Sequence, residues 1–156
     1  MIQSVLPTAL TVSELDRSLA FYCGLLGFEL AVELPPEAER ERWDAYHEQV
    51  CGIEGARIKV AYLRAADGTT HLELIEYVEP RVAAAARRSL AEPGVSIVAL
   101  SVRDSPAVVE RLRAAGADIL SEPVHYRCDD GTESYTTYLY DPDGNALCLF
   151  ETLEPR

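Results

Sequence analysis

Two related stretches of this sequence place reactive side chains in short apolar segments. His71 and Glu73 stand two residues apart in HLELIEY, and Cys148 takes the place of Glu73 in the later stretch NALCLFE. Residues two apart in a strand share a face, so His71 and Glu73 are expected to point to the same side. A carboxylate beside an imidazole can transfer protons or bind a divalent metal ion.

The other potential metal ligands are scattered along the chain. His125 lies in the stretch SEPVHYRCDDG, expected to be a loop, with Cys128 three residues further on. A zinc site made of His71 and Glu73 with either Cys148 or His125 is one interpretation. Zinc sites usually show tightly spaced ligand pairs, however, and the four cysteines form no CxxC pair. Structural histidines and free thiols, typical of a reducing cytoplasm, are therefore favoured.

Length and charge exclude several classes of partner. The 156 residues predict one compact domain or two small modules that share a core. Fourteen basic and 26 acidic residues give a net charge of −12, which argues against nucleic acids and anionic membranes as partners. No apolar run is long enough to span a membrane, and the first ten residues lack the pattern of a secretory signal.

The elements that must position these side chains repeat once along the chain. ALTV at 9–12 matches ALSV at 99–102, and each is followed by a helical pattern that ends at Gly27 or Gly116. Each half then continues with three more strand-like segments, the last two joined by an Asp-Gly turn. Strands are expected at 4–12, 28–34, 57–63, 71–77, 96–102, 117–123, 134–140 and 145–151.

Each half is therefore a βαβββ module, and neither is large enough for a good core of its own. We expect one domain over 1–156, made of a first module at about 1–78 and a second at about 95–156. EPRVAAAARRSLAEPG, residues 79–94, is expected to be a short linking helix. Ser13 is the expected N-cap of the first module's helix.

ALTVSELDRSLAFYCGLLGF, followed much later by YLYDPDGNALCLFE, resembles the vicinal oxygen chelate superfamily. That superfamily includes glyoxalase I, methylmalonyl-CoA epimerase, extradiol dioxygenases, and fosfomycin and bleomycin resistance proteins. The resemblance implies an α+β fold in which two fused βαβββ modules form a cup-shaped, curved mixed sheet with helices on its outer face. In metal-dependent members, the first and last strands of each module supply four ligands to a divalent ion inside the cup.

By this resemblance, the four ligand positions correspond to Pro7, Glu73, Ile97 and Cys148. Proline and isoleucine side chains cannot coordinate a metal ion, so one of the usual ligands remains. The pattern is similar to the metal-free branch, of which bleomycin resistance proteins are the familiar example. We therefore expect neither a metal site nor a cofactor.

Strand alternation, with the family comparison, indicates which side chains line the cup. These side chains are mostly aromatic or small and apolar, a composition typical of a pocket for an organic ligand, although they could also simply fill a sheet face. The expected ligand-binding residues are Tyr62, His71, Glu73, Ile97, Tyr138, Tyr140, Cys148 and Phe150.

The insert at 35–55 holds the single tryptophan, Trp43, in a helical pattern that places Tyr46 and Val50 on the same face. It is either an ordinary amphipathic helix packed on the sheet or a lid in which Trp43 stacks on a planar ligand. Acidic residues of the insert, Asp44 among them, are expected on the opposite face.

Three functions remain open. The first is a metal-independent carrier or sequestering protein for a small aromatic or polycyclic molecule. The second is a metal-free isomerase, epimerase, cyclase or lyase acting on a small carbonyl compound, with Glu73 as base and His71 or Tyr138 as its partner. The third is a metal-dependent glyoxalase or dioxygenase with displaced ligands. A homodimer is expected, because small modules with open sheet edges tend to pair. The resemblance implies the same, since members of the superfamily commonly form dimers.

Overall fold

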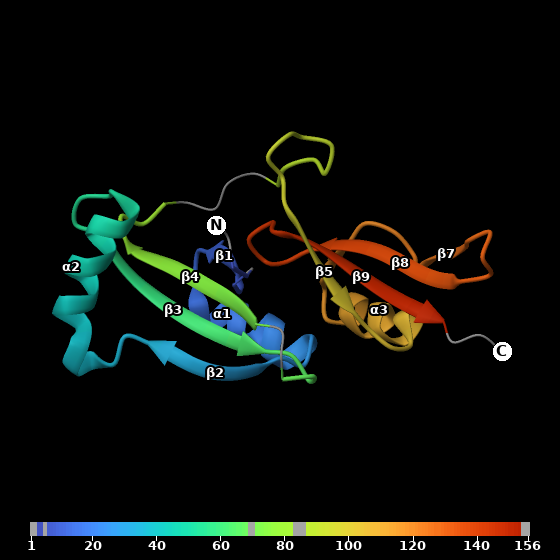
Figure 1. The fold of residues 1–156 in the computed structure, drawn as a ribbon, viewed down its shortest axis with the longest axis horizontal. Helices are drawn as coiled ribbons and strands as arrows, with labels where there is room; N and C mark the ends of the chain where they lie inside the picture. Colours follow the sequence, from blue (N-terminus) through green and yellow to red (C-terminus); the bar gives the residue numbers. More distant parts are fainter. Residues whose placement is uncertain (1–2, 5, 69–70, 83–86, 154–156) are drawn as a thin grey trace. The chain divides into compact units, whose positions relative to one another are not determined.

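The computed structural model describes residues 3–4, 6–68, 71–82 and 87–153, and of His71 only the backbone. The chain divides into two compact units, Met1–Ala84 and Ala85–Arg156. Each unit has the expected βαβββ order around its own mixed sheet, with additional elements (Figure 1). The βαβββ order predicted from the repeat and the α+β fold class implied by the family resemblance are therefore confirmed.

Unit 1 has a four-stranded sheet in the order β1-β4-β3-β2. β1 runs parallel to β4, while β4, β3 and β2 pair antiparallel. The helix after β1 continues as a π-helical segment, η1, and the insert between β2 and β3 forms α2 at the end of the sheet where β4 finishes (Figure 1). The elements are β1 (Thr8–Val12), α1 (Leu15–Leu19), η1 (Ala20–Leu25), β2 (Glu29–Leu34), η2 (Glu37–Glu39), α2 (Arg40–Cys51), β3 (Arg57–Arg64) and β4 (His71–Glu79).

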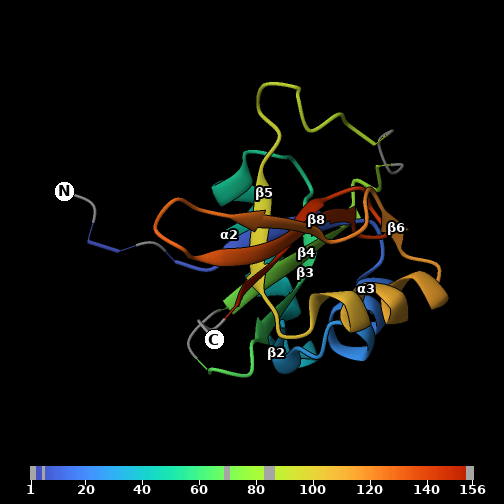
Figure 2. The ribbon, with the colours of Figure 1, turned by 90° about the vertical axis from the view of Figure 1, so that its right-hand side faces the viewer.

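Unit 2 repeats this arrangement with a divided edge strand. Its sheet has the order β5-β9-β8-β6, and β7 pairs with β8 on the edge that β6 also occupies. β5 runs parallel to β9, and α3 packs against β6 and β9 (Figure 2). The elements are β5 (Ile97–Ser101), α3 (Ser105–Ala114), β6 (Asp118–Ile119), β7 (Val124–Arg127), β8 (Glu133–Tyr140) and β9 (Ala146–Leu153). None of the described helices is long and apolar enough to cross a membrane.

Alternation along β4 and β9 decides which face of each sheet is buried. Leu72 and Leu74 of β4 are at most 1% exposed, whereas Glu73 between them is half-buried. In unit 2, Leu147 and Leu149 are fully buried against the side that carries α3. Burying each such leucine contributes roughly 1.5–3 kcal/mol, so a one-residue slip of either strand would be strongly unfavourable.

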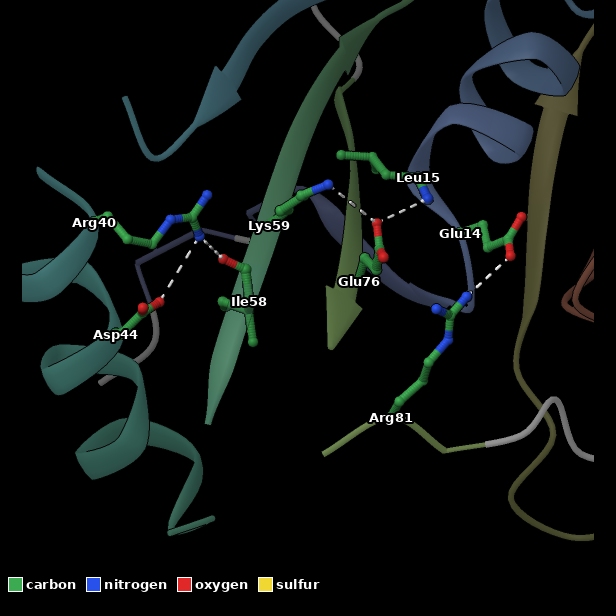
Figure 3. A network of polar contacts seen from close by, with 8 residues as sticks. All are labelled: Glu14, Leu15, Arg40, Asp44, Ile58, Lys59, Glu76 and Arg81. Carbon is green, nitrogen blue, oxygen red and sulfur yellow. Dashed lines mark hydrogen bonds and ion pairs between the residues drawn. The ribbon is translucent and has the colours of Figure 1, made fainter. Parts of the chain in front are cut away.

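Each sheet also holds the N-terminus of its helix through a carboxylate on its last strand. Glu76 Oε2 accepts a hydrogen bond of 3.0 Å from the backbone N–H of Leu15, at the start of α1 (Figure 3). In unit 2, the two oxygens of Glu151 accept bonds of 2.7 and 2.8 Å from the N–H groups of Asp104 and Ser105, at the start of α3. Both carboxylates satisfy amides that have no partner within the helix.

The expected N-cap Ser13 does not cap α1. Glu14 occupies the N-cap position without a side-chain bond to the helix, and Ser13 Oγ instead accepts a 2.8 Å hydrogen bond from Arg17. The distant Glu76 satisfies the Leu15 amide, as described above. The predicted helix ends are confirmed, since Gly27 and Gly116 both adopt φ of +81° just beyond them.

The described part of the linker does not show the linking helix expected over 79–94. Glu79 ends β4, and the described linker residues 80–82 and 87–94 contain bends and turns but no helix; residues 83–86 lie outside the described part. Tertiary contacts hold the second part of the linker on unit 2. The Tyr140 hydroxyl donates to the Arg88 carbonyl at 2.9 Å, and the Arg87 guanidinium lies 4.8 Å from the Tyr140 ring while pairing with Asp118.

Removing the carboxylate of Glu151 tests the second helix cap. Glu151→Ala leaves two helix-terminal N–H groups without an acceptor, and should lower the free energy of unfolding by roughly 1.5–3 kcal/mol. Glu151→Gln should lower the free energy of unfolding by a smaller amount, because the glutamine side chain keeps one acceptor oxygen. Glu110→Ala, at an exposed position of α3, serves as control and should stay within about 0.5 kcal/mol of the parent. Urea unfolding measures all three; equal effects at positions 151 and 110 would contradict the cap.

Candidate functional site

Glu73 lies in a row of side chains across the sheet of unit 1, on the face opposite the leucine core. Strand register places Ala9, Glu73, Tyr62 and Val32 side by side on β1, β4, β3 and β2. The Tyr62 hydroxyl donates a 3.1 Å hydrogen bond to Glu73 Oε1, and both side chains are half-buried. We call this surface the Glu73 face.

The electrostatics of this pair keep the Tyr62 phenol protonated. Burial raises the pKa of Tyr62, and the neighbouring Glu73 carboxylate raises this pKa further, both through its charge and by accepting the hydrogen bond; the nearby Tyr46 adds a smaller effect. A protonated phenol can only donate to Glu73 Oε1 here, so Tyr62 is a fixed hydrogen-bond donor on the Glu73 face.

The insert helix α2 was expected to pack on the sheet through the face that carries Trp43, Tyr46 and Val50. A different side of the helix faces the sheet. Its half-buried residues include Trp43, Asp44, His47 and Cys51, whereas Tyr46 is 58% exposed. The Trp43 ring lies against His47 with centroids 4.2 Å apart and the ring planes inclined by 41°, and its indole Nε1 is buried. Trp43 as a ligand-stacking residue thus stays a prediction.

Polar contacts fix the orientation of α2. Arg40 donates a 3.1 Å hydrogen bond to the Ile58 carbonyl on β3 (Figure 3), and Asp44, which was expected on the charged outer face, pairs with Arg40 at 3.8 Å and Arg57 at 3.5 Å. These ion pairs turn Asp44 toward the sheet.

In unit 2, the equivalent row consists of Ala99, Cys148 and Tyr138, on β5, β9 and β8. Cys148 therefore takes the structural position of Glu73, and Tyr138 that of Tyr62, as the repeat predicts. The Cys148 thiol is 7% exposed, and burial raises its pKa. It is therefore a neutral, weakly polar group that offers no charge to a ligand.

The other expected ligand-binding residues share this Cys148 face but differ in exposure. Ile97 is 42% and Phe150 40% exposed, whereas Tyr140 is 4% exposed with its hydroxyl bonded to Arg88. Register thus confirms that these side chains share a face, while their contact with a ligand stays a prediction.

The strand β7 extends the Cys148 face in a way the sequence analysis missed. Val124 pairs with Thr136, which itself pairs with Phe150, and Tyr126 lies two residues further on the same side. Both are well exposed, at 57% and 64%. The alternation of Val-His-Tyr-Arg at 124–127 was the signal that would have revealed this strand.

The donor set does not fit the four-ligand metal site that the family resemblance implies. Ile97 lies in β5 on the Cys148 face, and Pro7 directly precedes β1, so neither position offers a coordinating atom. Cys148 is buried with a raised pKa, which disfavours the thiolate that binds metals. Within the described residues, no three His, Cys, Asp or Glu side chains cluster as metal ligands do.

The remaining histidines have other surroundings. His125 lies in β7, not in a loop, and its Nε2 is 2.8 Å from Glu133 Oε2, while its ring packs 5.3 Å from Tyr135. His47 Nδ1 donates to the Trp43 carbonyl at 3.0 Å. The expected pairing of His71 with Glu73 involves a side chain outside the described atoms, and it stays a prediction.

Comparison with known proteins identifies the relatives of this chain. The family model described as Glyoxalase/Bleomycin resistance protein/Dioxygenase superfamily matches residues 4–149. A comparison with curated proteins finds no match.

Solved structures with a similar fold come from several organisms. A glyoxalase family protein from Bacillus cereus is 23% identical, with 99% of each chain covered and a TM-score of 0.79. The trypanothione-dependent glyoxalase I of Leishmania major is 20% identical over 96% of this chain and 87% of that one, with a TM-score of 0.61. A virulence protein from Salmonella typhimurium is 23% identical over 98% and 99% of the two chains, with a TM-score of 0.55. At these identities the likeness shows the fold alone.

The burial of Cys148 predicts slow alkylation of its thiol. A raised pKa leaves less reactive thiolate at neutral pH, and burial restricts access, so Cys148 should react with iodoacetamide at least about tenfold more slowly than the exposed Cys128. Peptide mass spectrometry over time measures both rates. In urea-unfolded protein the two should become similar, and equal rates in the native protein would contradict the burial of Cys148.

Proposed function

Because this chain belongs to the Glyoxalase/Bleomycin resistance protein/Dioxygenase superfamily, we propose that it is a member that binds a small aromatic or polycyclic organic ligand without a metal ion. The observation that carries this proposal is the Tyr62–Glu73 pair on an otherwise apolar row of the sheet. The ligand's polar end bonds to Glu73, and its body packs on the Tyr62 ring and the Val32 side chain.

The chemistry of the Glu73 face supports binding. A half-buried carboxylate loses hydration, and one hydrogen bond from a phenol offsets only part of that loss. A ligand that offers a second donor to Glu73 therefore gains more there than at a fully solvated carboxylate. The neighbouring Tyr62 ring and the Val32 side chain, 42% exposed, provide apolar contact area.

The Cys148 face supports the same function through different side chains. Phe150 and Tyr138 present rings, and the neutral Cys148 thiol lets an apolar group approach at little cost. We propose that Tyr138 and Phe150 form an aromatic binding surface of their own on unit 2. The homodimer and a cytoplasmic location, both expected from the sequence, remain predictions.

A metal-free isomerase, epimerase or cyclase is the second candidate. One observation favours it: the described contacts of Glu73 engage Oε1 through Tyr62, which leaves Oε2 able to take a proton from a substrate. In that case Glu73 is the base, and His71, two residues away on the same strand, is its proton-transfer partner. One substitution separates the two candidates, as described below.

The metal content of purified protein tests the first part of the proposal. Because Pro7 and Ile97 stand at two of the four ligand positions, zinc, nickel, iron and manganese should each be substoichiometric by elemental analysis. Addition of these ions should not raise the thermal unfolding temperature. About one tightly held divalent ion per chain, lost on Glu73→Gln, would contradict the proposal.

Glu73→Gln tests the binding role. Once a thermal-shift screen of aromatic compounds has found a ligand, losing a hydrogen bond to a charged group should cost roughly 1.5–3 kcal/mol, about ten- to a hundredfold in affinity by calorimetry. Phe150→Ala tests the Cys148 face of unit 2 separately and should weaken binding there through lost contact area. If the protein is an enzyme, Glu73→Gln should abolish turnover far more than binding, because glutamine keeps the shape but cannot accept a proton. A variant unchanged in both respects would refute both candidates.

A further inference from the structure

Half-buried carboxylates elsewhere in unit 1 are matched by positive charge. Asp44, with a side chain 18% exposed, lies 3.8 Å from Arg40 and 3.5 Å from Arg57. Glu76, 14% exposed, lies 4.0 Å from the Lys59 ammonium and also caps a helix (Figure 3). In both places, a nearby cation or a helix N-terminus stabilises a carboxylate that burial has partly dehydrated.

In unit 2, Glu133 is matched in the same way by Arg127, whereas Glu73 of unit 1 is not. Glu133 has His125 at 2.8 Å and Arg127 at 3.4 Å. In the described contacts, by contrast, Glu73 is bonded by the neutral phenol of Tyr62. Among the described contacts, no cation lies within ion-pair distance of its carboxylate.

The described row of Glu73 holds no positive charge: across the sheet it consists of Ala9, Tyr62 and Val32, and the next residue of β4 on the same face is Ile75. Arg64, two residues beyond Tyr62 on β3, shares this face, but it is exposed and forms no ion pair with Glu73 among the described contacts. An anionic group placed in this row would meet a like charge in a partly apolar setting, which is strongly disfavoured. A neutral donor would gain one hydrogen bond, whereas a cation would gain both a charge-assisted bond and neutralisation.

We propose that the polar end of the ligand is a cation, a protonated amine on an aromatic body, which pairs with Glu73 beside the Tyr62 ring. This inference rests on the proposed function and names the chemical class of its ligand. The Tyr62 ring adds a π-face beside the ammonium group. The protein's net charge of −12 draws cations toward the molecule, but the selectivity comes from the Glu73 face.

Three matched probes test the inference, with one aromatic body and three end groups: naphthylmethylamine, which is protonated at neutral pH, naphthylmethanol and naphthylacetate. Calorimetry measures each against the parent protein, Glu73→Gln and Glu33→Gln. Glu33 is exposed on the opposite face of the same sheet, where β2 pairs with Ala61. Its substitution removes the same single charge without touching the Glu73 face, and thermal unfolding checks that all variants fold.

The parent should bind the amine at least about tenfold more tightly than the alcohol, and the acid most weakly. Glu73→Gln should remove the preference for the amine, and Glu33→Gln should keep it. Equal or tighter binding of the alcohol or acid overturns the cationic ligand but leaves the proposed function standing. A preference that survives Glu73→Gln overturns the assignment to Glu73. If none of the probes binds, both the inference and the proposed function are overturned.

Discussion

A carboxylate on the last strand of each unit, bonded to the first turn of that unit's helix, sets the arrangement of everything else. Glu76 and Glu151 hold their helices on the side of the sheet where the leucines lie. Side chains alternate along a strand, so fixing Glu76 on the helix side places Glu73 on the other side, and fixing Glu151 does the same for Cys148. One interaction, used twice, supports the core and orients the candidate site.

Much of this fold follows from local sequence, and the exceptions share a cause. The alternation around Glu73 and Cys148 and the Asp-Gly turns are enough to predict the strands, their faces and the βαβββ order. The helix expected over 79–94 is absent from the described linker residues 80–82 and 87–94, where tertiary contacts can override a local preference. Here Tyr140 and Asp118 hold Arg88 and Arg87 in a non-helical path. Such partners are distant in the sequence, so no local pattern reveals them.

The candidate site is predictable in its faces but not in its detailed contacts. Parity and the repeat place Tyr62 beside Glu73 and Tyr138 beside Cys148, as the strand register has them. The side of α2 that packs on the sheet could not be derived, because helical spacing groups Trp43 with apolar residues, whereas ion pairs of Asp44 determine the rotation of the helix. The two units thus share a scaffold but present different chemistry, a carboxylate in one and a neutral thiol in the other.

The contacts of Arg87 and Arg88 also bear on how the polypeptide can be divided. Both residues precede position 95, where the repeat alone would start the second unit, yet they lie against Tyr140, Asp118 and Gly144. A protein fragment that begins at residue 95 would expose the ring of Tyr140, and the Tyr140 hydroxyl would lose its hydrogen bond to the Arg88 carbonyl. A self-standing second half must therefore include the stretch from Arg87 onward, so the break between the duplicated halves lies nearer to the end of β4 than their sequence similarity indicates.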